Sequence, residues 1–140
     1  MRSNKIKYGL GILVALVGSF LVIKNINGPL NVHSLKTYDN VVGSGSEAVK
    51  GKVASIKYTI WNSKGEIIES SKQHNNQPYV FTIGEDHVLK GWSDGIIGMK
   101  VGGKRKILIP SELAFGTKGV GNIIQANESL SSEIELVKIE

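Results

Sequence analysis

Between residues 51 and 139 apolar and polar positions alternate with a period of two, which is typical of β-strands. The clearest run is 53–61, where one face is apolar and the other is mixed. The glycine-containing turn at 62–65 then predicts a hairpin whose second strand begins at Ile67. Further strands are predicted over 78–83, 104–109 and 132–139. Several antiparallel strands with one small helix indicate an α+β domain.

That helix is predicted in the stretch 88–99, which departs from the strand pattern. Its apolar residues are spaced by three and four positions and are Leu89, Trp92, Ile96 and Met99. A helix of about two turns cannot bury its apolar side alone, so we expect it to pack against the sheet. On pattern alone, Trp92 is either a core side chain or part of a binding site.

The first 24 residues follow a third pattern. Arg2, Lys5 and Lys7 precede a run of sixteen uncharged residues, 8–23, and Lys24 closes it. A helix without a polar face belongs in a bilayer or to a signal peptide. We favour a transmembrane anchor over 1–24, with a cleaved signal peptide as the alternative.

The positive charges before this run place the N-terminus in the cytoplasm and the domain outside it. We therefore expect an exported, membrane-anchored domain on the extracytoplasmic side, or a secreted or periplasmic one if the segment is cleaved. Residues 25–45 lack sustained periodicity, and the Gly-Ser repeat at 43–46 is flexible by composition. This predicts a linker over 25–45 and a domain over 46–140, with Val41 and Val42 as a candidate edge strand.

Charge and composition exclude several classes of function. The net charge is +5, but residues 25–140 carry 13 basic and 12 acidic groups, so the domain is nearly neutral. Lys104 and Lys106 lie in a predicted strand from which Arg105 points to the opposite side, so we expect a solvated face and no nucleic-acid partner. Cysteine is absent, which excludes disulfides and thiolate chemistry. The histidines are dispersed without ligand spacing, and no phosphate-loop signature occurs, so we expect no metal and no cofactor.

Several short motifs, however, follow one another in the order and spacing of a known family. They are Gly51-x-Val53, Tyr58-Thr59, Gly65, Ser70-Ser71, Pro78-Tyr79-x-Phe81-x-x-Gly84, Val88-x-x-Gly91-Trp92-x-x-Gly95-x-x-Gly98-Met99-x-x-Gly102, Ile109-Pro110, Ala114-Phe115-Gly116 and Glu135-Leu136. Over residues 43–140 the chain resembles the FKBP-type peptidyl-prolyl cis-trans isomerases, the macrolide-binding immunophilins. The resemblance implies a twisted antiparallel half-barrel sheet wrapped around one short helix, with a ligand pocket between them.

The resemblance also implies peptidyl-prolyl cis-trans isomerase (rotamase) activity that assists the folding of exported proteins. Rotation about an X–Pro bond breaks amide resonance, against a barrier of about 18–20 kcal/mol. Because the planar amide is more polar than the twisted one, a dry apolar pocket lowers this barrier without a nucleophile, a metal or a proton relay. The implied partners are proline-containing segments of client proteins and macrolide ligands, with the membrane contacted through residues 8–23.

In the matching pocket, Trp92 resembles the floor on which the proline ring sits, and the Leu89 N–H resembles the donor to the substrate carbonyl. The implied catalytic residues are Tyr58, Glu69, Trp92 and Phe115. The implied substrate-binding residues are Tyr58, Ile68, Tyr79, Val88, Leu89, Trp92, Phe115 and Ile124.

Four positions depart from the family pattern. Ile68 replaces a phenylalanine, and Glu69 replaces an aspartate that hydrogen-bonds to the tyrosine. Phe115 replaces a tyrosine whose hydroxyl donates to the ligand, and Ser132 stands where the last strand supplies a phenylalanine. Together these changes are expected to open and wet the pocket. The alternative function is therefore an FKBP-fold peptide-binding or chaperone-like module with weak or no isomerase activity.

Overall fold

The computed structural model describes residues 28–85 and 87–140. The apolar run 8–23 that predicts a membrane anchor lies outside the described residues. Within them, no helix is long and apolar enough to cross a membrane.

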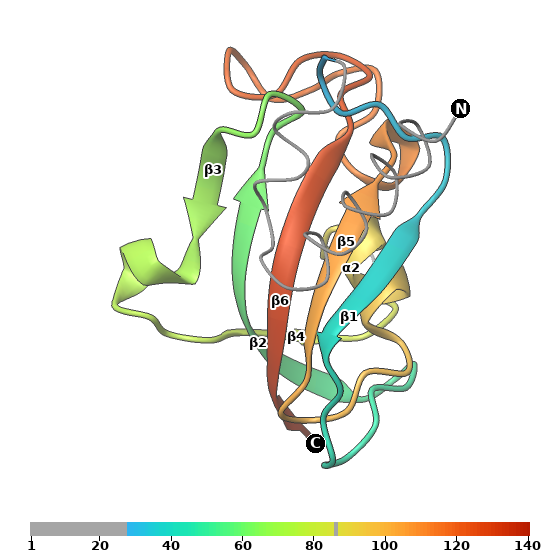
Figure 1. Cartoon of the computed structure of the whole chain (residues 1–140), viewed down its shortest axis with the longest axis vertical. Helices are drawn as coiled ribbons and strands as arrows, with labels where there is room; N and C mark the ends of the chain where they lie inside the picture. The colour runs from blue at the N-terminus through green and yellow to red at the C-terminus, as the bar shows by residue number, and fades with distance from the viewer. Residues whose placement is uncertain (1–27, 86) are drawn as a thin grey trace, which may run out of the picture.

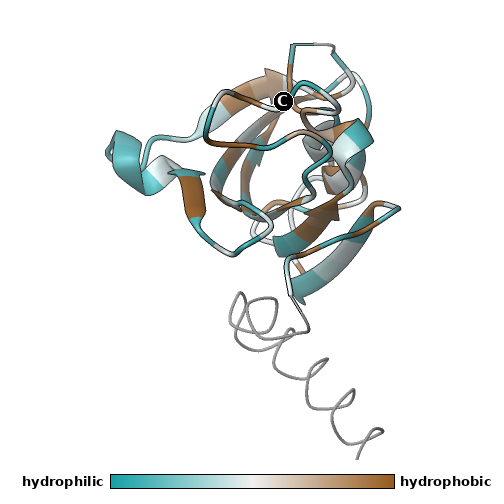
Figure 2. Cartoon of the chain, turned by 90° about the horizontal axis from the view of Figure 1, so that it is seen from above, coloured by the Kyte–Doolittle hydropathy of each residue, from teal (hydrophilic) through white to brown (hydrophobic). Residues whose placement is uncertain are grey.

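The described residues form an antiparallel sheet and one short α-helix (Figure 1). The strands are β1 (Lys36–Val41), β2 (Val53–Trp61), β3 (Ile67–Ser70), β4 (Tyr79–Thr82), β5 (Lys104–Ile109) and β6 (Leu130–Ile139); the helix is α2 (Lys90–Ile96), and two 3₁₀ turns are η2 (Ser71–His74) and η3 (Ser111–Leu113). The sheet order is β1-β5-β6-β2-β3, and β4 also pairs with β2. Seen from above, the strands curve around the helix, while η2 stands out to one side (Figure 2). The predicted α+β half-barrel is confirmed.

The core lies between the concave face of the sheet and α2. Alternate residues of the long strands face it, among them Ile56 on β2, Ile107 on β5 and Ile134 on β6, which are fully buried. This is the period-two pattern that predicted the strands. Strands β2 and β6 pair along most of their length, from Ala54 opposite Ile139 to Trp61 opposite Ser131, and so form the centre of the sheet.

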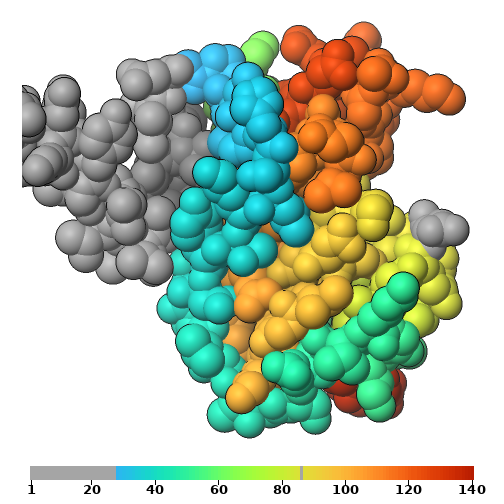
Figure 3. All heavy atoms as spheres, turned by 90° about the vertical axis from the view of Figure 1, so that its right-hand side faces the viewer, coloured from blue at the N-terminus to red at the C-terminus, as the bar shows by residue number. Residues whose placement is uncertain are grey.

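The predicted linker over 25–45 does not hold for residues 36–41, which form β1 at the edge of the sheet. β1 pairs with β5 from Lys36 opposite Leu108 onward. Figure 3 shows this part of the chain, blue to cyan, lying against the gold and orange residues that come later in the sequence. The strand is almost entirely exposed, so its sequence carries no apolar alternation that could have predicted it.

Two glycines let α2 lie close to the sheet. Gly91 and Gly95 are one turn apart on the same side of the helix, facing Ile109 and Ile107. A Cβ at Gly95 would lie 2.6 Å from the Ile107 Cδ1, which is closer than carbon atoms pack. The glycine spacing therefore sets how closely the tryptophan of this helix approaches the strands.

Arg105 points from β5 toward α2, but the solvated face expected for Lys104 and Lys106 does not hold for Lys106, which is buried. The Arg105 Nη1 donates to the carbonyl oxygens of Gly95 at 2.8 Å and Ile97 at 2.9 Å, which satisfies acceptors at the helix C-terminus. Its Nε and Nη2 donate to Asp39 of β1 at 2.6 and 3.2 Å. One side chain thus joins β1, β5 and α2.

Candidate active site

Four aromatic side chains meet on the concave face of the sheet. The Trp92 ring lies with its centroid 4.7 Å from that of Tyr58, 5.8 Å from Tyr79 and 6.5 Å from Phe81. Trp92 and Phe81 are buried, whereas Tyr79 is 37% exposed. The cluster therefore reaches the surface at Tyr79. Rings at these separations pack favourably as well as burying apolar area.

Strand pairing brings these rings together. In the β2–β4 ladder Ile56 lies opposite Tyr79 and Ala54 opposite Phe81, so both β4 rings share one face with the β2 residues that point inward. Tyr58 follows Ile56 by two residues and points the same way. The Ser71 hydroxyl bonds to the Tyr58 backbone, accepting from its N–H at 3.1 Å and donating to its carbonyl at 3.2 Å. The Ser71 side chain thus satisfies the backbone hydrogen-bonding groups of Tyr58, as a neighbouring strand would.

The Tyr58 hydroxyl donates a hydrogen bond to the Glu69 Oε1 at 2.8 Å. Glu69 thus makes the hydrogen bond to the tyrosine that the aspartate of the family pattern makes. Burial and the hydrogen bond to Glu69 both raise the pKa of Tyr58, so the phenol stays neutral at physiological pH. His74 from η2 lies 3.1 Å from the same carboxylate oxygen. The arrangement orients Tyr58 as a hydrogen-bonded ring and does not make it a base.

The start of α2 forms the next part of the site. Val88 is buried in the core, and Leu89 packs half-buried against it. The Leu89 carbonyl accepts from the N–H groups of Trp92 at 2.9 Å and Ser93 at 3.2 Å. Among residues 28–85 and 87–140, the Leu89 N–H donates to no acceptor. Helix N-termini leave such donors available to ligands.

Ser132 does not open the site to water, contrary to the expectation from sequence. It is completely buried, and its Oγ accepts a hydrogen bond from the Trp92 Nε1 at 3.0 Å. The same Oγ donates to the Thr59 carbonyl at 3.1 Å. The hydroxyl is therefore enclosed and bonded on both sides.

The loop between β5 and β6 brings two further predicted residues to different places. Ile124 is 4% exposed and joins the core cluster that contains Trp92. Phe115 is 40% exposed and takes part in none of the ring contacts of the described residues. Phe115 thus stands at the surface, while Ile124 lies inside.

Ile68, the remaining predicted pocket residue with an aliphatic side chain in place of an aromatic one, lies on β3. It is half-buried and packs against the core.

Glu128 fixes this loop to the turn after β2. Its Oε1 accepts from the Ser63 N–H at 3.0 Å and the Ser63 hydroxyl at 2.7 Å, and its Oε2 accepts from the Gln125 N–H at 2.6 Å. Burial works to raise the pKa of Glu128, but these hydrogen bonds outweigh it and hold the pKa below its usual 4.5. The carboxylate thereby holds the segment that carries Ile124.

Two residues at this site were missing from the sequence-based set. Phe81 belongs to the motif Pro78-Tyr79-x-Phe81 and could have been included, because it shares a strand face with Tyr79. The role of Ser132 as a partner of Trp92 had no sequence signal, since the two residues are 40 positions apart.

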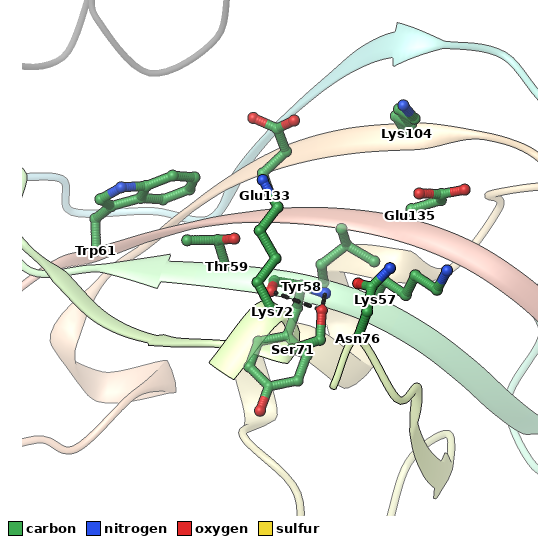
Figure 4. A pocket seen from close by; sticks show the side chains of 11 residues that line it. Lys57, Tyr58, Thr59, Trp61, Ser71, Lys72, Asn76, Lys104, Glu133 and Glu135 are labelled. Atoms are coloured by element: carbon green, nitrogen blue, oxygen red, sulfur yellow. Dashed lines mark hydrogen bonds between the residues drawn. The ribbon is translucent and has the colours of Figure 1, made fainter. Parts of the chain in front are cut away.

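A depression of about 420 Å³ lies on the opposite, outer face of the sheet (Figure 4). Its charged lining residues are Lys57, Lys72, Lys104, Glu133 and Glu135. Figure 4 shows Glu133 and Lys104 on one side of the strands and the Tyr58 ring on the other. A lining with charges of both signs does not provide the dry surface that an X–Pro bond requires, so the aromatic cluster is the better candidate site.

Comparison with known proteins shows to which family the chain belongs. The family of FKBP-type peptidyl-prolyl cis-trans isomerases matches residues 44–137. The chain belongs to this family. Its activity is accordingly the cis-trans isomerisation of peptidyl-prolyl bonds, and the fold and family expected from the motifs are confirmed.

Proteins of the same family from distant organisms are similar to this chain in sequence and in structure. The chain is 44% identical over 106 residues to the FK506-binding protein of Neisseria meningitidis serogroup A, covering 76% of this chain and 96% of that one. It is 44% identical over 91 residues to the peptidyl-prolyl cis-trans isomerase FKBP2 of Homo sapiens, covering 65% of this chain and 63% of that protein. The crystal structure of AtFKBP13 superposes with a TM-score of 0.69 at 33% identity, covering 81% of this chain and 99% of that chain.

Proposed function

We propose that this FKBP-type isomerase binds X–Pro segments against the aromatic cluster of Tyr58, Tyr79, Phe81 and Trp92. The observation that carries the proposal is the combination of an apolar aromatic surface with the Leu89 N–H at the start of the same helix, which donates to no acceptor within residues 28–85 and 87–140. The proline ring would lie against Trp92, and the N–H would bind a carbonyl of the substrate.

This arrangement suits rotation about an amide bond. The ground-state amide is planar and polar, and rotation removes its resonance. An apolar site removes the water that solvates the planar amide and so favours it. The Leu89 N–H meanwhile holds the substrate peptide on one side of the rotating bond. Tyr58 stays neutral and hydrogen-bonded to Glu69, so it contributes shape and a fixed dipole. No proton has to move in this reaction.

We also propose that the site takes macrolides of the kind named in the Neisseria relative, an FK506-binding protein. Phe115 has no hydroxyl to donate to such a ligand. One neutral hydrogen bond contributes about 0.5–1.5 kcal/mol, so its absence weakens binding without removing it.

For location, we propose that residues 8–23 anchor the chain in a membrane and that the isomerase domain acts on exported proteins outside the cytoplasm. The uncharged run and the positive residues before it support this proposal. Fractionating the producing cells and sequencing the N-terminus of the protein test it. An intact N-terminus in the membrane fraction is expected; an intact N-terminus in the soluble cytoplasmic fraction would contradict it.

Binding at the proposed site can be mapped directly. A prolyl peptide is titrated into the isotope-labelled full chain in mild detergent, and the NMR spectrum is followed. We expect the Leu89 amide and the Trp92 indole to shift most. A matched peptide with alanine in place of proline is the control. Shifts confined to the outer-face residues Lys57, Lys104 and Glu133 would overturn the assignment of the site.

A further inference from the structure

Within the described residues, the hydroxyl of Ser132 is the acceptor of the hydrogen bond that the Trp92 indole N–H donates. A serine hydroxyl has one hydrogen to donate and lone pairs to accept with. Here the hydrogen goes to the Thr59 carbonyl at 3.1 Å, and the oxygen accepts from the Trp92 Nε1 at 3.0 Å. Since Ser132 is completely buried, water does not compete for either bond.

The hydrogen bond from Trp92 to Ser132 also bears on how the indole ring is oriented within the aromatic cluster. The rings of Tyr58, Tyr79 and Phe81 contact Trp92, but ring contacts fix a separation better than they fix a rotation in the plane of the ring. A hydrogen bond is directional. The bond from Nε1 to β6 therefore fixes which edge of the indole faces the sheet and which face remains for a ligand.

We propose that Ser132 is a positioning residue for the isomerase site, which acts by holding the Trp92 indole in the orientation that receives the proline ring. This inference rests on the proposed function, in which the proline lies against Trp92. It also assigns the Ser132 hydroxyl a function in the site, as a directional acceptor for the indole N–H. Strand β2 carries the Thr59 carbonyl and β6 carries Ser132, so the central strand pair of the sheet sets the orientation of the helix side chain.

Removing the hydroxyl should affect the site more than the fold. In Ser132→Ala the indole N–H faces β6 without an acceptor, and the ring is free to turn toward another partner. We expect kcat/KM for a prolyl peptide to fall about three- to tenfold, the range that one hydrogen bond represents. Ser132→Cys keeps a weak acceptor of similar size and should lie between Ala and Ser. Ser131→Ala is the matched control, because Ser131 is equally buried but is the neighbouring residue on β6 and points to the outer face.

The test combines an NMR readout with the activity, using the full chain in mild detergent. Trp61→Phe identifies which of the two indole resonances belongs to Trp92. In Ser132→Ala the Trp92 indole proton should shift and exchange faster with water, while Ser131→Ala leaves it in place. These measurements need no substrate. If the indole responds as expected but no variant, including the parent, isomerises the peptide, then the proposed function fails and the hydrogen bond stands as structural.

A double-mutant cycle separates positioning from packing. If Ser132 acts through the indole N–H, then Ser132→Ala should have little further effect on peptide affinity once Trp92→Phe has removed the donor. An equal loss in both backgrounds would overturn the proposal, because the effect would then run through the Thr59 carbonyl or through packing. An unchanged kcat/KM in folded Ser132→Ala would also overturn it. If Ser132→Ala fails to fold, Ser132→Cys carries the same comparison.

Discussion

The Tyr58 hydroxyl and the Glu69 carboxylate are joined by a hydrogen bond of 2.8 Å, although the glutamate side chain enters from the short strand β3. The contact holds the hydroxyl end of Tyr58, while its ring centroid lies 4.7 Å from that of Trp92 in a tilted arrangement. The Glu69 carboxylate thus orients the Tyr58 ring, which forms one wall of the aromatic cluster.

Removing the Glu69 acceptor should therefore weaken catalysis moderately. Glu69→Ala leaves the Tyr58 hydroxyl without its partner, and we expect kcat/KM to fall about two- to tenfold. Glu69→Gln keeps an oxygen acceptor and should stay close to the parent. Glu133→Gln, on the outer face of the sheet, controls for the loss of a charge. Equal losses in Glu69→Ala and Glu69→Gln would show that the charge matters and the hydrogen bond does not.

The close approach of α2 to β5 predicts that a better helix former destabilises the protein. Alanine at Gly95 gains helix propensity, but its Cβ would overlap the buried Ile107 side chain. We expect Gly95→Ala to lower the free energy of unfolding by about 1–3 kcal/mol in urea titrations. Asp94→Ala is the control on the exposed side of the same helix and should change it by less than about 0.5 kcal/mol. A stabilised Gly95→Ala would contradict the packing account.

Glu128 predicts a dependence of stability on pH. Its pKa in the folded state lies below the usual 4.5, so its contribution is present above that pH and is lost as the pH falls through the folded-state pKa. Glu128→Gln lacks this contribution and turns an amide N–H₂ toward donors. The difference in unfolding free energy between the parent and Glu128→Gln should be largest near about pH 7 and shrink toward about pH 3. A difference that stays constant over that range would show that the carboxylate charge plays no part.

The sequence predicted most of the sheet and the helix because these elements carry strong periodic patterns. Strand β5 was placed at its observed bounds, and α2 lies inside the predicted stretch 88–99. Strand β1 was missed except near Val41, because an exposed edge strand has no buried face to impose alternation on its sequence. It is held by backbone pairing with β5 and by the Asp39–Arg105 contact, neither of which leaves a local signal.

The site was predictable to the extent that motif and strand face determine it. That Tyr58 and Tyr79 share one face of the sheet follows from strand parity once β2 and β4 are paired. The bond between Trp92 and Ser132 depends on the register of β6 against β2 and on the depth at which α2 sits, which involve residues far apart in sequence. The sequence pattern therefore predicts that Ser132 opens the pocket, whereas its hydroxyl is buried and hydrogen-bonded on both sides.

The most direct test of the account is the rate of prolyl isomerisation by the full chain in mild detergent, measured with a chymotrypsin-coupled peptide assay. The folded parent should accelerate the reaction above background. Trp92→Ala, checked for folding by circular dichroism, should lose at least about tenfold of kcat/KM, because burial of a prolyl ring against a large aromatic side chain contributes at least about 1.4 kcal/mol. No rate above background from the folded parent, or an unchanged rate in Trp92→Ala, would contradict the claim that this aromatic cluster is the isomerase site.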